Sequence, residues 1–241
     1  MNLGRPGRTE AMRALDYSGG PQPGYVAFDV ETATKDPSSV CAVGLAVIDG
    51  GRVVERGSYL TRPPTPDFAY TCIHGICAND LREKPAFHEF WPWLKQYFEN
   101  RLVIAHNADF DVSALRHALD AYGIAHPTLC YLCTQRLAKR LWPGLDSYGL
   151  ARIAIHLGVD FTHHDPAEDA LACAHIALRG CEQLKVETLE DLASQTGILL
   201  GRMSPECFEK CRLIPQPGTV AEEEEDHRRR HRGKPRNHSL R

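Results

Sequence analysis

The sequence has no run of about 18 consecutive apolar residues, the length that indicates a transmembrane helix. Its first 23 residues also lack the apolar stretch of a secretory signal peptide. The formal net charge is only −3, so the overall charge does not indicate nucleic-acid binding, and a basic patch would have to be local. We therefore expect a cytoplasmic protein that does not associate with membranes.

The nine cysteines are an odd number, and several lie in apolar segments such as residues 40–43. This pattern favours reduced, buried thiols over a disulfide framework. Cys130 and Cys133 have the spacing of half a zinc site, to which Cys207 and Cys211 would supply the other half. A single CxxC lacks the paired spacing of such sites, so we favour ordinary thiols.

The chain of 241 residues, with 43% hydrophobic and 24% charged residues, suits one soluble domain with tails. Residues 1–23 have no periodicity and predict a disordered arm. Residues 186–220 form a C-terminal extension with a short helix expected at 189–195. Residues 221–241 are an acidic run followed by a basic run, which predicts a disordered charged tail. The basic run either binds nucleic acid or is offset by the acidic run, and we favour the second interpretation.

Residues 24–185 form the expected folded domain. Strands are expected at residues 25–32, 40–49, 52–60 and 102–106, with a hairpin at Gly50-Gly51. Helices are expected at residues 85–98, interrupted by Pro92, and at 108–122, 135–141, 147–157 and 166–184. Three closely joined antiparallel strands followed by helices predict an α/β fold with a mixed sheet covered by helices.

The first expected strand carries two carboxylates in an otherwise apolar run. Asp29 and Glu31 are two positions apart, so both point to one face of the strand, about 7 Å apart. Burying both is costly unless a cation binds them, and an oxygen-only ligand set favours a hard ion such as Mg²⁺ or Mn²⁺. The alternative is that both acids face solvent at the end of the strand.

A second pair of acids follows the fourth expected strand. Asn107 is the expected N-cap of the next helix. At about 100° per residue, Asp109 falls on the solvent face of that helix and Asp111 on the core face. An inward acid is costly without a partner, although the helix dipole favours an anion at this end. Asp111 is therefore either a ligand or a helix-start charge at the boundary of the core.

The third segment has the pattern of a helix start. Asp165 is the expected N-cap, and Glu168 is positioned to complete a capping box. His164 and Asp169 then occupy the two positions that meet across a helix start, with Asp169 on the inward face. His163 is expected to be a solvent-exposed loop histidine, and the same interpretation remains open for His164.

Together these segments resemble the DEDDh family of 3′→5′ exonucleases, which includes the proofreading epsilon subunit of DNA polymerase III. The motifs that carry the resemblance are residues 28–32, 106–111 and 164–169, in the order and spacing of the family. Residues 73–76 resemble a further segment of the epsilon-like branch, although Cys77 follows where that branch usually has threonine. The resemblance implies an RNase H-like mixed β-sheet flanked by helices.

The resemblance also implies an activity and a site. The activity would be the release of nucleoside monophosphates from DNA 3′ ends by hydrolysis with two Mg²⁺ or Mn²⁺ ions. The implied site residues are the metal ligands Asp29, Glu31, Asp111 and Asp169, the general base His164, and the substrate contacts Thr32, His74 and Phe110.

The substrate implied by the resemblance is single-stranded DNA or a frayed DNA 3′ end, and a DNA polymerase is a candidate partner. Two alternatives remain open. One is an exoribonuclease acting on short RNA, and the other is a catalytically silent module that binds nucleic acid or a polymerase. The presence of all five catalytic residues argues against a silent module.

Overall fold

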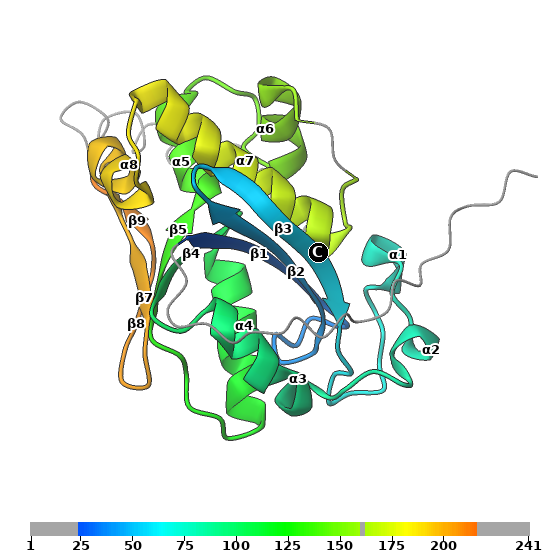
Figure 1. The fold of residues 1–241 in the computed structure, drawn as a ribbon. Helices are drawn as coiled ribbons and strands as arrows, with labels where there is room; N and C mark the ends of the chain where they lie inside the picture. Colours follow the sequence, from blue (N-terminus) through cyan, green and yellow to red (C-terminus); the bar gives the residue numbers. More distant parts are fainter. Residues whose placement is uncertain (1–23, 160–161, 216–241) are drawn as a thin grey trace, which may run out of the picture.

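The computed structural model describes residues 24–159 and 162–215 of the chain (Figure 1). The predicted N-terminal arm and the predicted charged tail, residues 1–23 and 221–241, lie outside the described residues. Among the described residues, no helix combines the length and the apolar character needed to cross a membrane.

The described residues form nine strands and eight α-helices. The strands are β1 Tyr25–Thr32, β2 Val40–Asp49, β3 Arg52–Leu60, β4 Arg101–Ala105, β5 Leu129–Cys133, β6 Ile198–Leu199, β7 Gly201–Met203, β8 Phe208–Glu209 and β9 Arg212–Leu213. The helices are α1 Thr71–His74, α2 Ala78–Leu81, α3 Phe87–Leu94, α4 Asp109–Ala121, α5 Thr134–Leu141, α6 Leu150–Leu157, α7 Pro166–Leu184 and α8 Leu189–Thr196. Each strand and helix that the sequence predicted is present, with small differences at the ends.

Seven of the strands form one mixed sheet in the order β3-β2-β1-β4-β5-β7-β8. β1, β2 and β3 are antiparallel neighbours, as their short connections predicted, and Gly50 and Gly51 both adopt positive φ in the hairpin. β4 and β5 run parallel to β1. The carboxyl ends of these three parallel strands therefore lie at the same edge of the sheet, where α/β folds form their ligand sites.

Helices cover both faces of the sheet (Figure 1). α7 packs across β1, β2 and β3 on one face, with α5 and α6 beside it, whereas α4 packs against β1 on the other face. On β1, the ring of Phe28 packs edge-on against Phe98, with ring centroids 5.0 Å apart. Because side chains alternate along a strand, the next residue, Asp29, points to the α7 face.

One predicted helix is shorter than expected, and one strand of the main sheet was not predicted. The helix expected at residues 85–98 ends at Leu94 and continues as a 3₁₀ turn over Lys95–Tyr97, with Pro92 inside the α-helix. β5 was not predicted, and it contains the CxxC pair. Cys130 and Cys133 are three positions apart on a strand, so their side chains point to opposite faces and cannot bind one zinc ion together. All nine cysteines are free thiols, as we expected.

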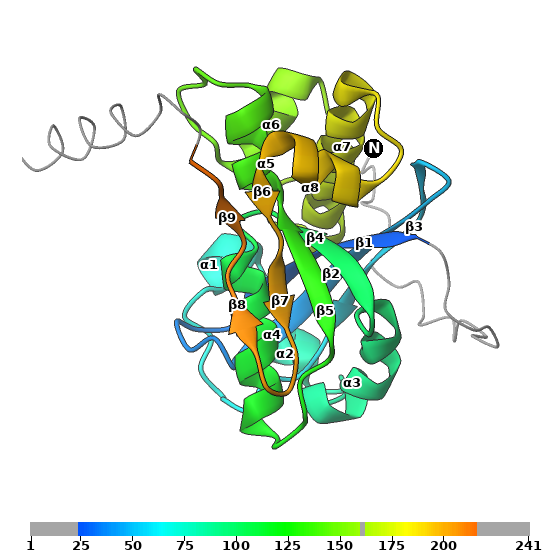
Figure 2. The ribbon, with the colours of Figure 1, turned by 90° about the vertical axis from the view of Figure 1, so that its left-hand side faces the viewer.

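The C-terminal extension continues the main sheet (Figure 2). β7 pairs antiparallel with β5, and β8 pairs with β7 at the edge. The ring of Tyr131 lies so close to Gly201 that a Cβ there would be 2.1 Å from it. The hydroxyl of Tyr131 also accepts a hydrogen bond from the backbone N–H of Cys211, at 3.3 Å. These strands have two or three residues each, too few for a periodic pattern to predict them.

Candidate active site

Asp29 and Glu31 point to the same face of β1, as their spacing predicted. Strand pairing sets Asp29 beside Gly44 of β2 and Glu31 beside Ala42. Both acidic residues remain partly exposed, whereas Val30 between them is buried. The two acids therefore lie together at the end of a strand whose other face belongs to the core.

The first turn of α7 brings Asp169 to the acids of β1. The side chain of Asp165 caps the helix, as predicted, by accepting a hydrogen bond from the backbone N–H of Ala167 at 3.1 Å. Glu168 does not close the predicted capping box, because its carboxylate forms an ion pair with Arg56 of β3 at 2.7 Å. Asp169 is only 3% exposed, which confirms its predicted inward orientation.

Gly44 of β2 allows α7 to approach the sheet this closely. A Cβ at this position would lie 1.8 Å from the carbonyl oxygen of Pro166, a distance that no real side chain tolerates. Because Gly44 pairs with Asp29 in the sheet, its contact with α7 helps to set the separation of Asp29 and Asp169. Sequence analysis did not identify Gly44, since only the tertiary contact reveals its role.

Asp111 reaches the site from the start of α4. It is 2% exposed, and its Oδ1 accepts a hydrogen bond from the backbone N–H of Val30 at 3.0 Å. Its predicted inward orientation is therefore confirmed. The predicted N-cap is wrong by one residue, because α4 begins at Asp109 with Ala108 as its N-cap. Asn107 precedes them with a φ of 55°, a conformation that asparagine tolerates better than most residues.

Burial raises the pKa values of the clustered carboxyls. Desolvation raises the pKa of Asp29 well above its usual value, and the charges of Asp111 and Asp169 raise it further. Desolvation, with a contribution from Asp169, raises the pKa of Glu31 to about 7. The pKa of Asp111 is also raised by desolvation, although its hydrogen bond from Val30 opposes the shift. The charged groups that act on Asp29 are all carboxyls, so this cluster lacks the compensation that a cation would give.

The clustered carboxyls form a suitable ligand set for a divalent cation. Carboxylate oxygens of Asp29, Glu31 and Asp169 all lie within 4.8 Å of one another. An oxygen-only set of this kind favours Mg²⁺ or Mn²⁺. A bound cation would favour the charged form of each carboxyl and so reverse the rise in pKa. The residues present therefore fit the metal that the sequence predicted.

Asp109 does not face solvent, contrary to the prediction. Its Oδ2 forms an ion pair with Arg136 of α5 at 2.9 Å, and its Oδ1 accepts a hydrogen bond from the hydroxyl of Tyr131 at 3.1 Å. The side chain is 19% exposed. The helical wheel correctly separated Asp109 from Asp111, but α5 and β5 cover that side of α4.

Both histidines that precede α7 lie at Asp169. The backbone N–H of His164 donates a hydrogen bond to Oδ2 at 3.0 Å, and Nδ1 of His163 lies 3.0 Å from Oδ1. The two imidazole rings stack with centroids 3.9 Å apart. His164 lies next to Asp169 as predicted, and His163 is exposed as predicted. The contact of His163 with Asp169 was not predicted, since it depends on the turn at His164, whose φ is 65°.

The three predicted substrate contacts differ in exposure. Phe110 is 48% exposed, whereas Thr32 and His74 are buried. Nδ1 of His74 accepts a hydrogen bond from the backbone N–H of Ile76, and Nε2 donates one to the carbonyl of Thr32 at 3.2 Å. Burial lowers the pKa of His74, which keeps the ring neutral. Both ring nitrogens are therefore used within the fold, where they hold the loop after α1 against the end of β1.

A second buried histidine supports the site and was not singled out from the sequence. Nε2 of His106 donates a hydrogen bond to the carbonyl of Tyr148 at 2.9 Å, and Nδ1 accepts one from the hydroxyl of Thr134 at 2.9 Å. Desolvation lowers the pKa of His106 to about 4, so the ring is neutral. This network joins the end of β4 to the start of α5. The feature of the sequence that could have indicated this network is that His106 is the first residue of the second motif, residues 106–111.

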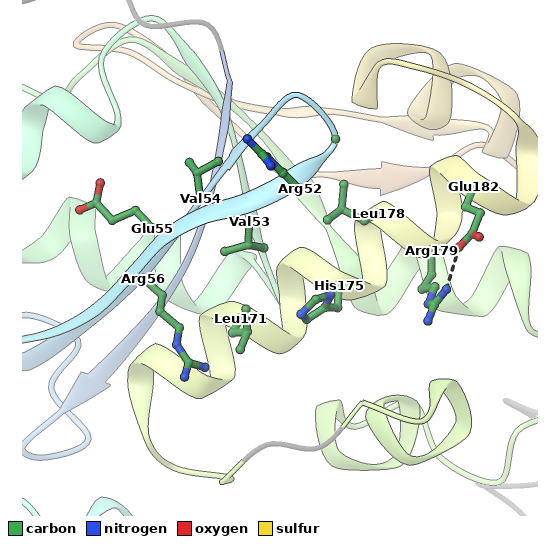
Figure 3. A pocket seen from close by; sticks show the side chains of 11 residues that line it. Arg52, Val53, Val54, Glu55, Arg56, Leu171, His175, Leu178, Arg179 and Glu182 are labelled. Atoms are coloured by element: carbon green, nitrogen blue, oxygen red, sulfur yellow. Dashed lines mark hydrogen bonds and ion pairs between the residues drawn. The ribbon is translucent and has the colours of Figure 1, made fainter.

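A groove of about 710 Å³ lies between β3 and α7 (Figure 3). Arg52 and Arg56 line it from β3, and His175 and Arg179 line it from α7. Arg179 forms an ion pair with Glu182 at 2.8 Å. None of the predicted site residues lines this groove, so the groove is separate from the clustered carboxyls.

Comparison with known proteins identifies relatives over most of the described chain. A family model described as an exonuclease matches residues 26–177. The chain is 31% identical over 165 residues to a PolC-type DNA polymerase III of Thermotoga maritima, and 26% identical over 182 residues to one of Caldanaerobacter subterraneus subsp. tengcongensis. These alignments cover 67% and 74% of this chain but only 12% and 13% of those proteins.

Two solved structures share the fold. Exonuclease X, in complex with 5′-overhanging duplex DNA, aligns with a TM-score of 0.59 at 23% identity, over 72% of this chain and 99% of that one. E. coli exonuclease I, in complex with a dA13 oligonucleotide, aligns with a TM-score of 0.54 at 18% identity, over 67% of this chain and 41% of that one. The family match and the three motifs agree with the geometry of the site. The chain therefore belongs to the exonuclease family, and within it to the DEDDh-type 3′→5′ exonucleases.

Proposed function

We propose that this protein shortens DNA from its 3′ end, releasing nucleoside monophosphates in a hydrolysis that depends on two divalent cations. The observation that carries the proposal is the cluster of four carboxyls where β1, α4 and α7 meet. The charged groups that raise the pKa of Asp29 are themselves carboxyls. Burying like charges together is costly in a purely structural role, so the cluster is best explained by the cations that it would bind.

Asp29, Glu31 and Asp169 would hold one cation, and Asp29 together with Asp111 would hold the second. Cations bound there would activate water as a nucleophile and stabilise negative charge on the attacking and leaving oxygens. The oxygen ligands favour Mg²⁺ or Mn²⁺. A bound cation would hold Glu31, whose pKa is otherwise raised to about 7, in its ionised form near neutral pH.

His164 would act as the general base that accepts a proton from the attacking water. Its imidazole is exposed and lies within 4.8 Å of a carboxylate oxygen of Asp169, so a water molecule and a phosphodiester can both reach it. The water oxygen attacks phosphorus and the bond from phosphorus to the 3′ oxygen breaks. The departing 3′ oxygen takes a proton from solvent, so the shortened strand ends in a 3′ hydroxyl. His163 is equally close to Asp169, and a pair of variants distinguishes the two histidines below.

Thr32 and Phe110 would contact the terminal nucleotide. Phe110 is 48% exposed and lies next to Asp111 in sequence, so its ring is available to stack on a base without reading sequence. His74 would act indirectly, by holding the carbonyl of Thr32 through its hydrogen bond.

DNA is the favoured substrate for two reasons. The PolC-type relatives are DNA polymerases by name, and the two solved neighbours were determined in complex with DNA. Single-stranded DNA and frayed 3′ ends would present the flexible terminus that such a site requires. An exoribonuclease acting on short RNA and a silent binding module are the alternatives.

Degradation of 3′-labelled DNA and RNA oligomers of matching sequence tests this proposal. We expect DNA to be shortened in Mg²⁺, to be stable in EDTA, and to be shortened again when Mg²⁺ or Mn²⁺ is restored. Faster degradation of RNA would favour the exoribonuclease, and binding without degradation would favour the silent module. Activity that survives chelation would contradict the two-cation mechanism. An Asp29→Asn variant purified in the same way controls for contaminating nucleases.

Association with a DNA polymerase is a further part of the proposal, supported by the PolC-type relatives. Size-exclusion chromatography of the full chain with the replicative polymerase of the same organism tests the association. Separate elution of the two proteins at micromolar concentrations would contradict the association.

A cytoplasmic location is also proposed and is supported by the nine free thiols, which persist in reducing compartments.

A further inference from the structure

The loop before α7 carries two adjacent imidazoles beside one buried carboxylate. We infer that His163, His164 and Asp169 form a binding site for Zn²⁺, and that Zn²⁺ bound there inhibits the exonuclease. Ring nitrogens of both histidines and a carboxylate oxygen of Asp169 all lie within 4.8 Å of one another. The inference about binding rests on this geometry alone, whereas the inference about inhibition rests on the proposed function.

The ligand types separate this site from the carboxyl cluster. Asp29, Glu31 and Asp169 offer only oxygen, which suits Mg²⁺ and Mn²⁺. His163 and His164 offer two imidazole nitrogens, which Zn²⁺ prefers, and Asp169 adds one carboxylate oxygen. Two imidazoles and a carboxylate are a ligand set found in zinc sites that keep a fourth position open. The two sites therefore share Asp169 but favour different ions.

The geometry suits a site that an ion can enter. The carboxylate of Asp169 is 4% exposed, and its Oδ2 is fixed by the backbone N–H of His164 at 3.0 Å. The side chain of His163 is 44% exposed, and its Nδ1 already lies 3.0 Å from Oδ1. The imidazole rings stack with an interplanar angle of 20°, so their edges lie side by side. The ligand atoms are already close together, and the two exposed rings would have to rotate out of their stacked arrangement for both lone pairs to point at one ion.

Binding of Zn²⁺ at this site would block hydrolysis for two reasons. A neutral imidazole has one ring nitrogen with an available lone pair. If that lone pair coordinates Zn²⁺, His164 cannot accept a proton from water, and the general base would be lost. The Oδ1 of Asp169 would turn toward Zn²⁺ and away from the carboxyls of Asp29 and Glu31. Both effects depend on the roles proposed above for His164 and Asp169.

Direct titration with Zn²⁺ tests the binding site without reference to activity. The full chain with Cys72→Ser and Cys207→Ser serves as the parent, because these two exposed thiols would compete for the ion. Zn²⁺ is titrated against a fluorescent zinc chelator. We expect His163→Ala and His164→Ala each to weaken the tightest Zn²⁺ binding at least tenfold, since loss of even an indirect partner costs about 10–100-fold.

His126→Ala is the matched control, because Nε2 of His126 lies 2.8 Å from Oδ1 of Asp120 in another histidine–aspartate pair. Among the described residues, no third metal-binding side chain joins His126 and Asp120, so loss of His126 should leave the tightest Zn²⁺ binding unchanged. Zinc affinity unchanged by His163→Ala or by His164→Ala, measured on folded protein by circular dichroism, would overturn the inferred site.

Inhibition is measured separately, as the Zn²⁺ concentration that halves the activity supported by Mg²⁺. For His163→Ala this concentration should rise at least tenfold, with each protein compared with its own activity in Mg²⁺ alone. An equal inhibitory concentration in the parent and the variant would overturn the inferred inhibition. A protein that binds Zn²⁺ as expected but degrades no nucleic acid would instead contradict the proposed function.

Discussion

Asp109 and Asp111 are two residues apart at the start of α4, yet their surroundings differ in charge. Asp109 is neutralised by the guanidinium of Arg136 and accepts a hydrogen bond from the hydroxyl of Tyr131. Asp111 accepts a hydrogen bond from Val30, but its pKa is raised by burial and further by the charges of Glu31 and Asp169. A carboxyl whose charge the fold neutralises stabilises the structure. A carboxyl left among other carboxyls destabilises the structure until a cation binds.

The comparison predicts opposite effects on stability when each charge is removed. Without Asp109, the partly buried guanidinium of Arg136 would lose its partner. Breaking such a pair costs up to about 3–5 kcal/mol when it is fully buried, and less here because both side chains are partly exposed. Without the charge of Asp111, the cluster would lose one of its repelling groups. Removing the charge of Asp109 should therefore lower stability, whereas removing the charge of Asp111 should raise stability but lower activity.

The largest predicted effect is on activity, in the variant Asp111→Asn. We expect this variant to lose about a thousandfold or more of kcat, because several kcal/mol of charge stabilisation by the cations would be lost. Its Tm in EDTA should rise, since one buried repelling charge is gone. Asp109→Asn is the matched control and should lose less than tenfold in kcat while its Tm falls. Equal losses of activity in the two variants would contradict the distinction between paired and unpaired carboxyls.

The second prediction distinguishes the two histidines at Asp169. His164→Ala should reduce kcat by about 10²–10⁴-fold, the usual contribution of a general base, with little change in KM. His163→Ala should reduce kcat by about tenfold, because it removes a hydrogen bond that orients Asp169. The measurement is kcat in Mg²⁺ for both variants. A larger loss in His163→Ala would assign the base to His163 and contradict the family-based assignment.

The third prediction concerns the spacing between β2 and α7. In Gly44→Ala, the new Cβ would begin 1.8 Å from the oxygen of Pro166, so α7 must move by roughly 1.5 Å to reach ordinary contact. A displacement of this size should reduce kcat by up to about 10²-fold and raise the Mg²⁺ concentration needed for half-maximal activity.

Gly57→Ala on β3 is the matched control for Gly44→Ala. The atoms nearest to a Cβ at Gly57 belong to the side chain of Tyr59, with its hydroxyl at 2.7 Å, and a side chain can move where a helix backbone cannot. The activity of Gly57→Ala should therefore depend on the Mg²⁺ concentration in the same way as the activity of the native protein. If Gly44→Ala loses stability but keeps the native dependence on Mg²⁺, then the glycine supports packing alone and does not position Asp169.

The sequence predicted the carboxyl cluster because local rules suffice for its parts. Alternation along β1 predicted the common orientation of Asp29 and Glu31, and the helical wheel predicted the inward orientation of Asp111 and Asp169. The mixed sheet followed from three closely joined strands and the helices after them. Each of these inferences needs only a short segment and its period.

The remaining features depend on contacts between distant segments. Asp109 looked solvent-exposed because nothing in α4 indicates that Arg136 and Tyr131 cover its face. Gly44 was not identified from the sequence, because its role depends on the contact with α7. The strands after α8 are too short for a pattern, and they form because Tyr131 of β5 packs against them. Local periodicity cannot predict such contacts.

The smallest predicted effect is on thermal stability, through the protonation of Glu31. Its pKa is about 7 in the fold against an ordinary value of 4.5. The folded state therefore binds more protons than the unfolded state between about pH 4.5 and 7, and the free energy of unfolding falls as pH rises through this window. In EDTA, the fall in Tm from pH 5 to 8 should be about 2–4 °C larger for the native protein than for Glu31→Gln, or roughly 1 kcal/mol, because partial exposure screens the charge. Saturating Mg²⁺ should remove this difference, since the cation favours ionised Glu31. Identical pH profiles of Tm for the two proteins in EDTA would show that Glu31 lies outside the repelling cluster.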